Sequence, residues 1–130
     1  MSAEERRTLS KLRLDKAQEA LNDAKSTLEK GRLRSAINRA YYAAFHAMRA
    51  MLALNEIDRR RHSGVTAEFL NLYVKTGLFD ASYPTIIRRM YNTHSKNEYD
   101  DIQNILYDDA VQQVQDAETV VESIKHFLSE

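Results

Sequence analysis

The stretch NRAYYAAFHAMRAML, residues Asn38 to Leu52, decides the fold of this chain. Its apolar side chains recur at helical spacing, in a helix that begins near Leu33, and six of them are small. These are the alanines at positions 36, 40, 43, 44, 47 and 50. Because they spread over most of the circumference, the predicted helix is apolar nearly all round. Such a helix lies at the centre of a bundle, or it is covered on a second side by another subunit.

Four polar side chains interrupt this apolar helix along one line. Arg39, Tyr42, His46 and Arg49 follow one another at spacings of three, four and three residues, which keeps them on one helical face. As a structural feature, such a row hydrogen-bonds and fixes the register of neighbouring helices or of a symmetric dimer. As a functional feature, it places two arginines beside a tyrosine and a histidine in a track for phosphate or RNA backbone. The sequence leaves both interpretations open.

Helical periodicity continues on both sides of this stretch. Residues 14–28 carry apolar side chains at steps of three and four, and Gly31 is placed to end that helix. A further helix is expected over about residues 65–75, with Ser63 as its N-cap and Gly77 just past its end. These two helices flank the central one in the chain.

The last third of the chain predicts two more helices. Pro84, the only proline, suits the first turn of a fourth helix. The inner face of that helix is expected to carry Ile87, Met90, Tyr91 and His94. The segment SKNEYDD, residues 95–101, is expected to loosen it, and a fifth helix follows from about Tyr107. We therefore predict an all-α fold, an antiparallel bundle of four to five helices, with residues 1–130 as a single domain.

Composition narrows the class of protein. The chain has no cysteine, which excludes a disulfide framework and a cysteine nucleophile and agrees with a reducing, cytoplasmic location. No apolar run is long enough to span a membrane, and the N-terminus has no signal-peptide core. No metal site is predicted, because no histidine has a second histidine three or four residues further on. No cofactor is expected either.

The charge balance bears on polyanion binding. Nineteen basic and nineteen acidic residues give a net charge of zero, so no overall field draws the chain onto nucleic acid. Local candidates are RRRH, residues 59–62, and the pair Arg88 and Arg89. The alternative is that these are solvated charges at loops and helix ends.

Several of these segments, in this order, resemble the HEPN domain family. The most specific part is the Tyr-Tyr-x-x-Phe-His-x-x-Arg run, residues 41–49, followed by RHSGV, VKTGLF and NEYDD ahead of a last amphipathic helix. The resemblance covers about residues 12–128 and is to the small stand-alone branch often encoded beside a minimal nucleotidyltransferase. It implies a dimeric helical bundle acting as a metal-independent ribonuclease toxin, with the nucleotidyltransferase as antitoxin. Other members of the family have lost catalysis and bind ligands or partners.

The family's catalytic signature, an arginine followed after four to six residues by a histidine, fits Arg89 and His94. Arg88 also fits, and so do Arg39 and His46. On an ideal helix, residues 89 and 94 diverge by about 140°. A functional pair therefore requires the helix to bend or end near Thr93, or a dimer that brings two copies together.

Other roles for the same residues remain open. His94 also fits a core-facing imidazole. Arg88 and Arg89 also fit surface ion pairs with the acidic pairs of the following segment, Asp100 with Asp101 and Asp108 with Asp109. In some toxin branches of the family, a tyrosine shortly after the histidine is modified with AMP by the nucleotidyltransferase, which makes Tyr99 a candidate for modification. Three functions follow: a ribonuclease toxin that binds RNA, a non-catalytic module that binds a nucleotide or the nucleotidyltransferase, and a structural helical adaptor.

Overall fold

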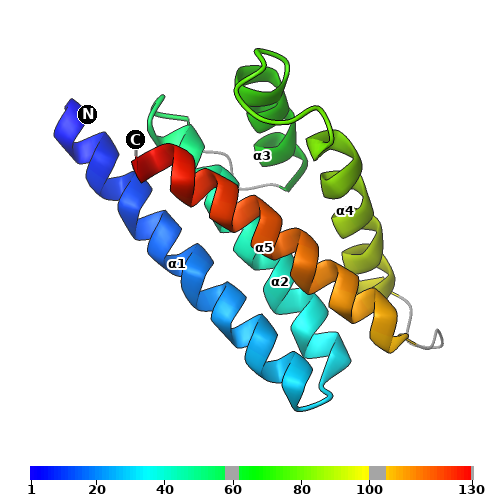
Figure 1. The fold of residues 1–130 in the computed structure, drawn as a ribbon. Coiled ribbons are helices and arrows are strands. Elements are labelled where there is room, and N and C mark those ends of the chain that lie inside the picture. The colour runs from blue at the N-terminus through cyan, green and yellow to red at the C-terminus, as the bar shows by residue number, and fades with distance from the viewer. Residues whose placement is uncertain (58–61, 100–104, 130) are drawn as a thin grey trace.

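The chain forms five helices, seen here in a computed structural model that describes residues 1–57, 62–99 and 105–129 (Figure 1). The helices are α1 (Ala3–Glu29), α2 (Leu33–Ala53), α3 (His62–Phe69), α4 (Tyr83–Tyr99) and α5 (Tyr107–Ser129), and α3 continues into a π-helical segment, Leu70–Val74. The described residues contain no strand. The predicted all-α bundle is therefore confirmed.

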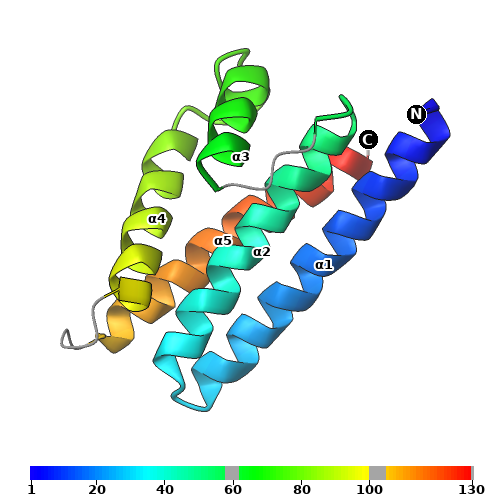
Figure 2. The same cartoon turned by 180° about the vertical axis from the view of Figure 1, so that it is seen from behind.

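Helix α2 is the centre of the bundle. It contacts each of the other four helices. In two opposite views, α2 and α5 lie stacked on each other, with α1 on one side and α3 and α4 on the other (Figure 1, Figure 2). The six alanines of α2 at positions 36, 40, 43, 44, 47 and 50 are all buried. The prediction of a central helix is confirmed, and small side chains explain how four neighbours approach it closely.

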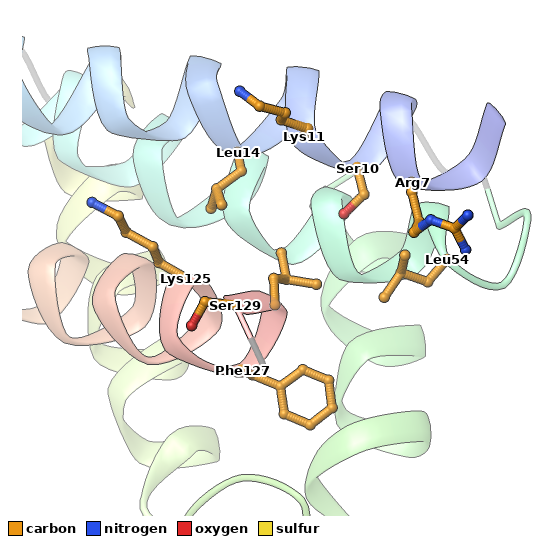
Figure 3. A pocket seen from close by; sticks show the side chains of 9 residues that line it. Arg7, Ser10, Lys11, Leu14, Leu54, Lys125, Phe127 and Ser129 are labelled. Atoms are coloured by element: carbon orange, nitrogen blue, oxygen red, sulfur yellow. The ribbon is translucent and has the colours of Figure 1, made fainter. Parts of the chain in front are cut away.

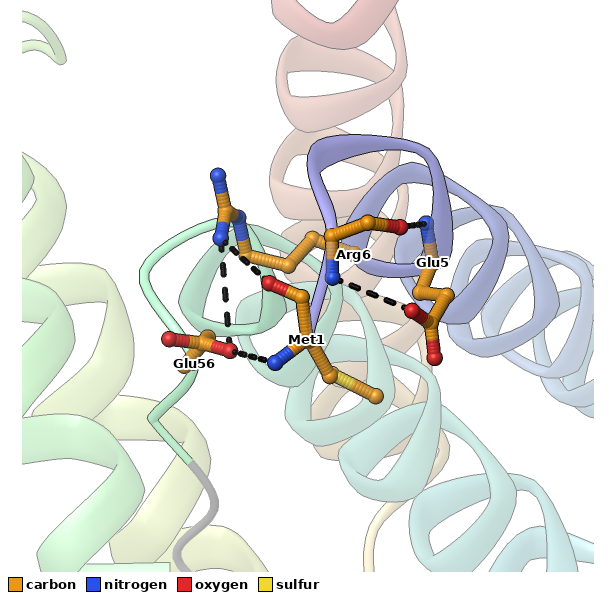
Figure 4. A network of polar contacts seen from close by, with 5 residues as sticks. Met1, Glu5, Arg6 and Glu56 are labelled. Carbon is orange, nitrogen blue, oxygen red and sulfur yellow. Dashed lines mark hydrogen bonds and ion pairs between the residues drawn. The ribbon is translucent and has the colours of Figure 1, made fainter.

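Helix α1 is longer than its apolar pattern indicates, because a capping box starts it near the chain's first residue. The Glu5 amide donates to the Ser2 hydroxyl and the Ser2 amide donates to the Glu5 carboxylate, each at 3.1 Å (Figure 4). The Met1 amino group lies 2.7 Å from the Glu56 carboxylate, which links this end to the loop after α2. At the other end the prediction is right: Gly31 follows the helix with a φ of 72°.

The segment after α2 packs through aromatic rings. Phe69 is fully buried, with its ring centre 5.5 Å from that of Tyr73 and 5.4 Å from that of Phe79. In the π-helical segment the Tyr73 hydroxyl donates to the Met51 carbonyl at 2.9 Å, which ties this segment to α2. Helix α3 begins one residue before the expected N-cap Ser63, whose side chain lies outside the described residues.

Two expectations for α4 are wrong. The helix does not loosen after His94 but continues to Tyr99, because two hydrogen bonds tie its last turns to the start of α2. The Asn97 side chain donates to the Arg34 carbonyl at 3.0 Å, and the Arg34 guanidinium donates to the Asn97 carbonyl at 3.0 Å. Tyr91 is not on the inner face, since its side chain is 51% exposed. It lies about 100° further round the helix than the buried Met90, at the edge of the apolar face.

Candidate functional site

Four polar residues lie along one face of α2, and we call them the α2 stripe: Arg39, Tyr42, His46 and Arg49. All four are partly buried. The Arg39 guanidinium lies 5.6 Å from the centre of the Tyr42 ring, and the Tyr42 and His46 rings are 6.2 Å apart. The Arg49 guanidinium lies 5.8 Å from the ring of Phe45. Cation–π attraction therefore holds both arginines against the helix with their charge retained.

His94 joins α4 to the α2 stripe. Its side chain is only 7% exposed and stacks flat on Tyr41, with ring centres 4.0 Å apart and ring planes 7° from parallel. The Tyr42 ring lies nearly perpendicular to the same imidazole, with ring centres 6.1 Å apart. The expectation that His94 faces the core is confirmed. Through Tyr42, the structure brings His94 together with Arg39 and His46, three of the sequence-predicted site residues.

Tyr41 adjoins the candidate site, although it is not among the sequence-predicted site residues. Burial raises the pKa of the Tyr41 phenol well above its usual value, and the phenols of Tyr91 and Tyr42 raise it further. The phenol therefore stays protonated near neutral pH. It supplies a flat surface against His94, and it is not a base.

Arg89 belongs to a different contact. Its guanidinium donates to the two carboxylate oxygens of Asp116 on α5 at 2.8 and 2.7 Å, and Gln112 donates to the same carboxylate at 3.0 Å. This side-chain hydrogen bond raises the pKa of Arg89 further. Asp116 is 5% exposed whereas Arg89 is 43% exposed, so the pair spans from the core to the surface. Arg89 does form an ion pair, but its partner is the buried Asp116 of α5 and not one of the acidic pairs of the segment after α4.

Arg89 and His94 are not brought together within one chain. Helix α4 runs without a break past Thr93, so the bend that would align the two side chains is absent. Arg88 is exposed on the same helix. The side chain of Tyr99, the last residue of α4, and the Arg59–Arg61 part of RRRH lie outside the described residues, as does the His62 side chain.

A polar hollow of about 180 Å³ lies beside His46, between α1 and α2. It is lined by Lys16, Glu19, Ala20, Asp23, Arg39 and His46. The Nδ1 atom of His46 is buried there and makes no hydrogen bond to the described residues. The residues that α1 contributes to this hollow were not predicted from the sequence. The spacing of Lys16, Glu19 and Asp23 could have indicated them, because it places the three on one face of α1.

The surroundings of the α2 stripe place it on one side of the bundle. The hollow beside His46 is shared with α1, and Tyr42 meets His94 of α4. The stripe therefore lies on the face of α2 between α1 and α4, which is the face toward the viewer in Figure 2. The Arg13 guanidinium donates to the Arg49 carbonyl at 3.2 Å and fixes α1 at one end of this face.

The charge around His46 predicts a pH dependence of stability. Burial lowers the pKa of His46, and the positive charges of Lys16, Arg49, Arg39 and Arg13 lower it further. Above about pH 6.5, the usual pKa of a histidine, His46 is neutral in the folded chain and in the unfolded chain. As the pH falls below that value, the unfolded chain takes up the proton before the folded chain does. We therefore expect the free energy of unfolding to fall as the pH drops below this value. In the His46→Gln variant the free energy of unfolding should fall less over the same pH range.

Urea denaturation at pH 8 and pH 5.5 measures this difference. Carboxylates titrate in the wild type and the variant alike, so the difference between them isolates His46. His126→Gln, at an exposed position on α5, is the matched control and should behave like the wild type. An equal loss of stability between pH 8 and pH 5.5 in the wild type and in His46→Gln would contradict the expected contribution of His46.

No group of three His, Cys, Asp or Glu side chains in the described part of the chain is arranged to hold a metal ion. None of the described helices is both long and apolar enough to cross a membrane.

The bundle and its Tyr-Tyr-x-x-Phe-His-x-x-Arg helix agree with one family of proteins. The sequence pattern of the HEPN domain matches residues 10–128, and the chain belongs to the HEPN domain family. The chain is similar to the UPF0332 protein of Thermotoga maritima, with 30% identity over 115 residues, 88% of this chain and 87% of the relative. A Methanocaldococcus jannaschii protein named "Putative toxin" is 32% identical over 121 residues, 88% of this chain and 84% of the relative.

A third relative is more similar over a shorter stretch. The UPF0332 protein of Pyrococcus horikoshii is 42% identical over 81 residues, which are 62% of this chain. The match spans 54% of that relative, about half its length.

Proposed function

We propose that this protein is the toxin component of a two-component pair, a metal-independent ribonuclease whose antitoxin is a minimal nucleotidyltransferase. Membership of the HEPN family supports the proposal, and so do two relatives from Methanocaldococcus jannaschii that carry the name "Putative toxin". The observation that carries it is the contact of His94 with Tyr41 and Tyr42. This contact joins an imidazole to a row of cationic and aromatic side chains suited to an RNA backbone.

The chemistry assigns separate roles to His94 and Arg89. The imidazole removes the proton of a ribose 2′-hydroxyl, and the 2′-oxygen then attacks the adjacent phosphorus. The bond to the 5′-oxygen breaks, that oxygen takes a proton from a solvent water, and the imidazolium returns its proton to solvent. The products are a 2′,3′-cyclic phosphate and a 5′-hydroxyl. The Arg89 guanidinium offsets the negative charge that builds on the phosphate oxygens. Asp116 holds this guanidinium in one orientation.

A second copy of the chain is part of this proposal. Arg89 and His94 diverge on the unbroken helix α4, so a catalytic pair needs Arg89 of one copy beside His94 of the other. A symmetric homodimer through the faces that carry α4 would supply that arrangement twice. It would also line a groove between the copies, and RNA would have to reach the almost fully covered imidazole from there.

The α2 stripe would then bind the RNA strand on its way to His94. Arg39 and Arg49 hold their charge beside aromatic rings, and Arg88 extends the positive surface along α4. Guanidinium groups pair with two phosphate oxygens at once, which suits a backbone track. Modification of Tyr99 with AMP by the nucleotidyltransferase would block access to this track, and mass spectrometry after incubation with that partner and ATP tests it.

Induced expression tests the proposed pairing in cells. We expect the chain expressed alone to arrest growth and to leave cleaved RNA. Co-expression with the minimal nucleotidyltransferase encoded beside it should restore both growth and intact RNA. Normal growth with intact RNA, at a confirmed level of folded protein, would contradict the toxin assignment.

A non-catalytic HEPN module is the second candidate function. Two observations favour it: Arg89 is engaged by Asp116, and His94 is almost fully covered. In this case the α2 stripe binds a nucleotide or the nucleotidyltransferase, and no RNA is cut. Co-purification with the nucleotidyltransferase, without arrest and without RNA cleavage, would identify this function in place of the first.

A further inference from the structure

Tyr91 is a half-exposed aromatic residue beside the candidate site, and no step of the proposed function uses it. Its side chain is 51% exposed, whereas His94, three residues further along α4, is 7% exposed. The Tyr91 ring makes no aromatic contact, and its hydroxyl makes no hydrogen bond, with the residues that the structure describes. An aromatic surface next to the buried imidazole is therefore free to contact a ligand.

The helical period places Tyr91 on the open side of α4. His94 points at Tyr41 of α2, where the two rings stack. Relative to His94, Tyr91 is turned by about 60° in one direction and Arg89 by about 140° in the other. Arg89 bonds to Asp116, so Tyr91 lies on the side of α4 that faces away from α5. Helix α5 lies behind α2 in Figure 2, and this side of α4 therefore adjoins the face of α2 that carries the stripe.

An interaction between α2 and α4 supports this placement. Burial is the main cause of the raised pKa of the Tyr41 phenol, and the phenol of Tyr91 adds to it, so the two phenols lie close enough to interact. Residues three positions apart on a helix, such as Tyr91 and His94, have their Cβ atoms only about 5–6 Å apart. Tyr41, His94 and Tyr91 therefore form one cluster, in which Tyr91 is the exposed member.

Positive charge flanks Tyr91 on the same face. Arg88 is exposed three residues before it, about 60° further round α4. Arg39 and Arg49 of the α2 stripe lie against aromatic rings on the neighbouring helix. Glu98, about two turns after Tyr91, is the only acidic residue in α4. Proteins that bind single-stranded nucleic acid combine a positive groove with aromatic rings on which bases stack, and this face has both.

A hollow of about 480 Å³ at the other end of the bundle lacks this combination. It lies where α1 passes the last turn of α5, and its cations Arg7 and Lys125 lie at opposite ends of it and point apart (Figure 3). Phe127 is the one aromatic residue among those given for its lining. The face formed by α2 and α4 is therefore the better surface for an RNA strand.

We propose that the Tyr91 ring stacks on a nucleobase of the bound RNA and holds the adjoining ribose beside His94. This inference rests on the proposed ribonuclease function and adds a positioning residue to it. One base stacked on an aromatic ring contributes about tenfold in affinity, and every base can stack because each has a π-face. Tyr91 therefore strengthens RNA binding without selecting a sequence.

Binding of a single-stranded 2′-O-methyl RNA that carries 2-aminopurine tests this contact apart from cleavage, because the attacking hydroxyl is blocked. We expect Tyr91→Ala and Tyr91→Leu to bind this RNA about tenfold more weakly than the wild type. Tyr91→Phe keeps the ring and should bind within about twofold of the wild type. Stacking quenches 2-aminopurine, so the bound RNA should fluoresce more strongly on the first two variants than on Tyr91→Phe.

A similarly exposed tyrosine provides the control. Tyr107 is 58% exposed on α5, the helix behind α2 in Figure 2, and Tyr107→Ala should bind the RNA normally. With unmodified RNA, Tyr91→Ala should raise KM about tenfold and leave kcat nearly unchanged, because stacking holds substrate and transition state alike. A merely structural role of Tyr91 would not produce this split.

Three outcomes decide the matter. Normal binding and normal quenching with Tyr91→Ala would overturn the stacking contact. Loss of RNA binding together with dissociation of a dimer into monomers, measured by sedimentation, would overturn it in favour of a contact between two copies of the chain. RNA that is bound through Tyr91 but never cut would support the stacking contact and contradict the ribonuclease function, so the two proposals fail separately.

Discussion

His94→Ala is expected to lower the rate of RNA cleavage by about 10²- to 10⁴-fold, the range that a positioned general acid or base contributes. In the proposed mechanism this imidazole transfers the proton, and its ring centre lies 6.1 Å from that of Tyr42 in the α2 stripe. Cleavage of an RNA oligonucleotide, followed by gel electrophoresis at saturating and at limiting substrate, measures the effect on kcat and on kcat/KM.

A second substitution separates chemistry from packing. His94 stacks on Tyr41 at 4.0 Å, so alanine also removes a ring from the core. His94→Phe keeps a flat ring against Tyr41 but carries no exchangeable proton, and it should lose as much activity as His94→Ala while keeping stability closer to the wild type. His126→Ala, on the surface of α5, is the matched control and should cleave RNA normally. Full activity in His94→Phe would remove the histidine from the mechanism.

Arg89→Ala is expected to lower the free energy of unfolding by about 2–3 kcal/mol, which is at or below the lower end of the roughly 3–5 kcal/mol that loss of one partner of a buried pair costs. The Asp116 carboxylate is 5% exposed and would keep only the hydrogen bond from Gln112, so its charge would be left buried and poorly compensated. The full cost of a buried pair is not expected, because Arg89 itself is 43% exposed and solvent screens its charge. Urea denaturation followed by circular dichroism measures the change.

The neighbouring arginine provides the control for that experiment. Arg88→Ala should change stability by less than about 0.5 kcal/mol, because Arg88 is exposed on the same helix. Arg89→Ala combined with Asp116→Ala should recover part of the loss, since no charge is then buried without a partner. Equal stability of Arg88→Ala and Arg89→Ala would show that the ion pair does not support the fold. Activity of Arg89→Ala must be compared at temperatures where the variant is folded.

The central position of α2 could be predicted because the apolar pattern that indicates it runs along the whole helix. Six small side chains at helical spacing indicate a helix with neighbours on several sides, and all six are buried. The start of α1 gave no such signal, since its first turns are polar and the helix is started by the Ser2 and Glu5 capping box. The continuation of α4 to Tyr99 was also missed, because it depends on Asn97 bonding to Arg34, a residue 63 positions away.

The candidate site was predictable only where local spacing determines it. His94 lies on the line of Ile87 and Met90, so its inward direction follows from the helical period. The ion pair of Arg89 with Asp116 joins residues 27 positions apart on two helices, and no periodic pattern indicates it. The flat stacking of Tyr41 on His94 likewise depends on how α2 and α4 pack. The catalytic proposal also requires two copies of the chain in a defined arrangement. The hydrophobic pattern of a single helix does not specify how two copies pack, so this arrangement could not be predicted from the sequence.

Cleavage of RNA by the purified protein in the presence of EDTA tests the central claim most directly. The account predicts cleavage without any divalent metal, with 2′,3′-cyclic phosphate and 5′-hydroxyl ends. A 2′-deoxy substitution at the cut position should block the reaction, because the attacking oxygen is then missing. Intact RNA at protein concentrations that support a dimer, or equal cleavage of the 2′-deoxy substrate, would contradict the proposed ribonuclease mechanism.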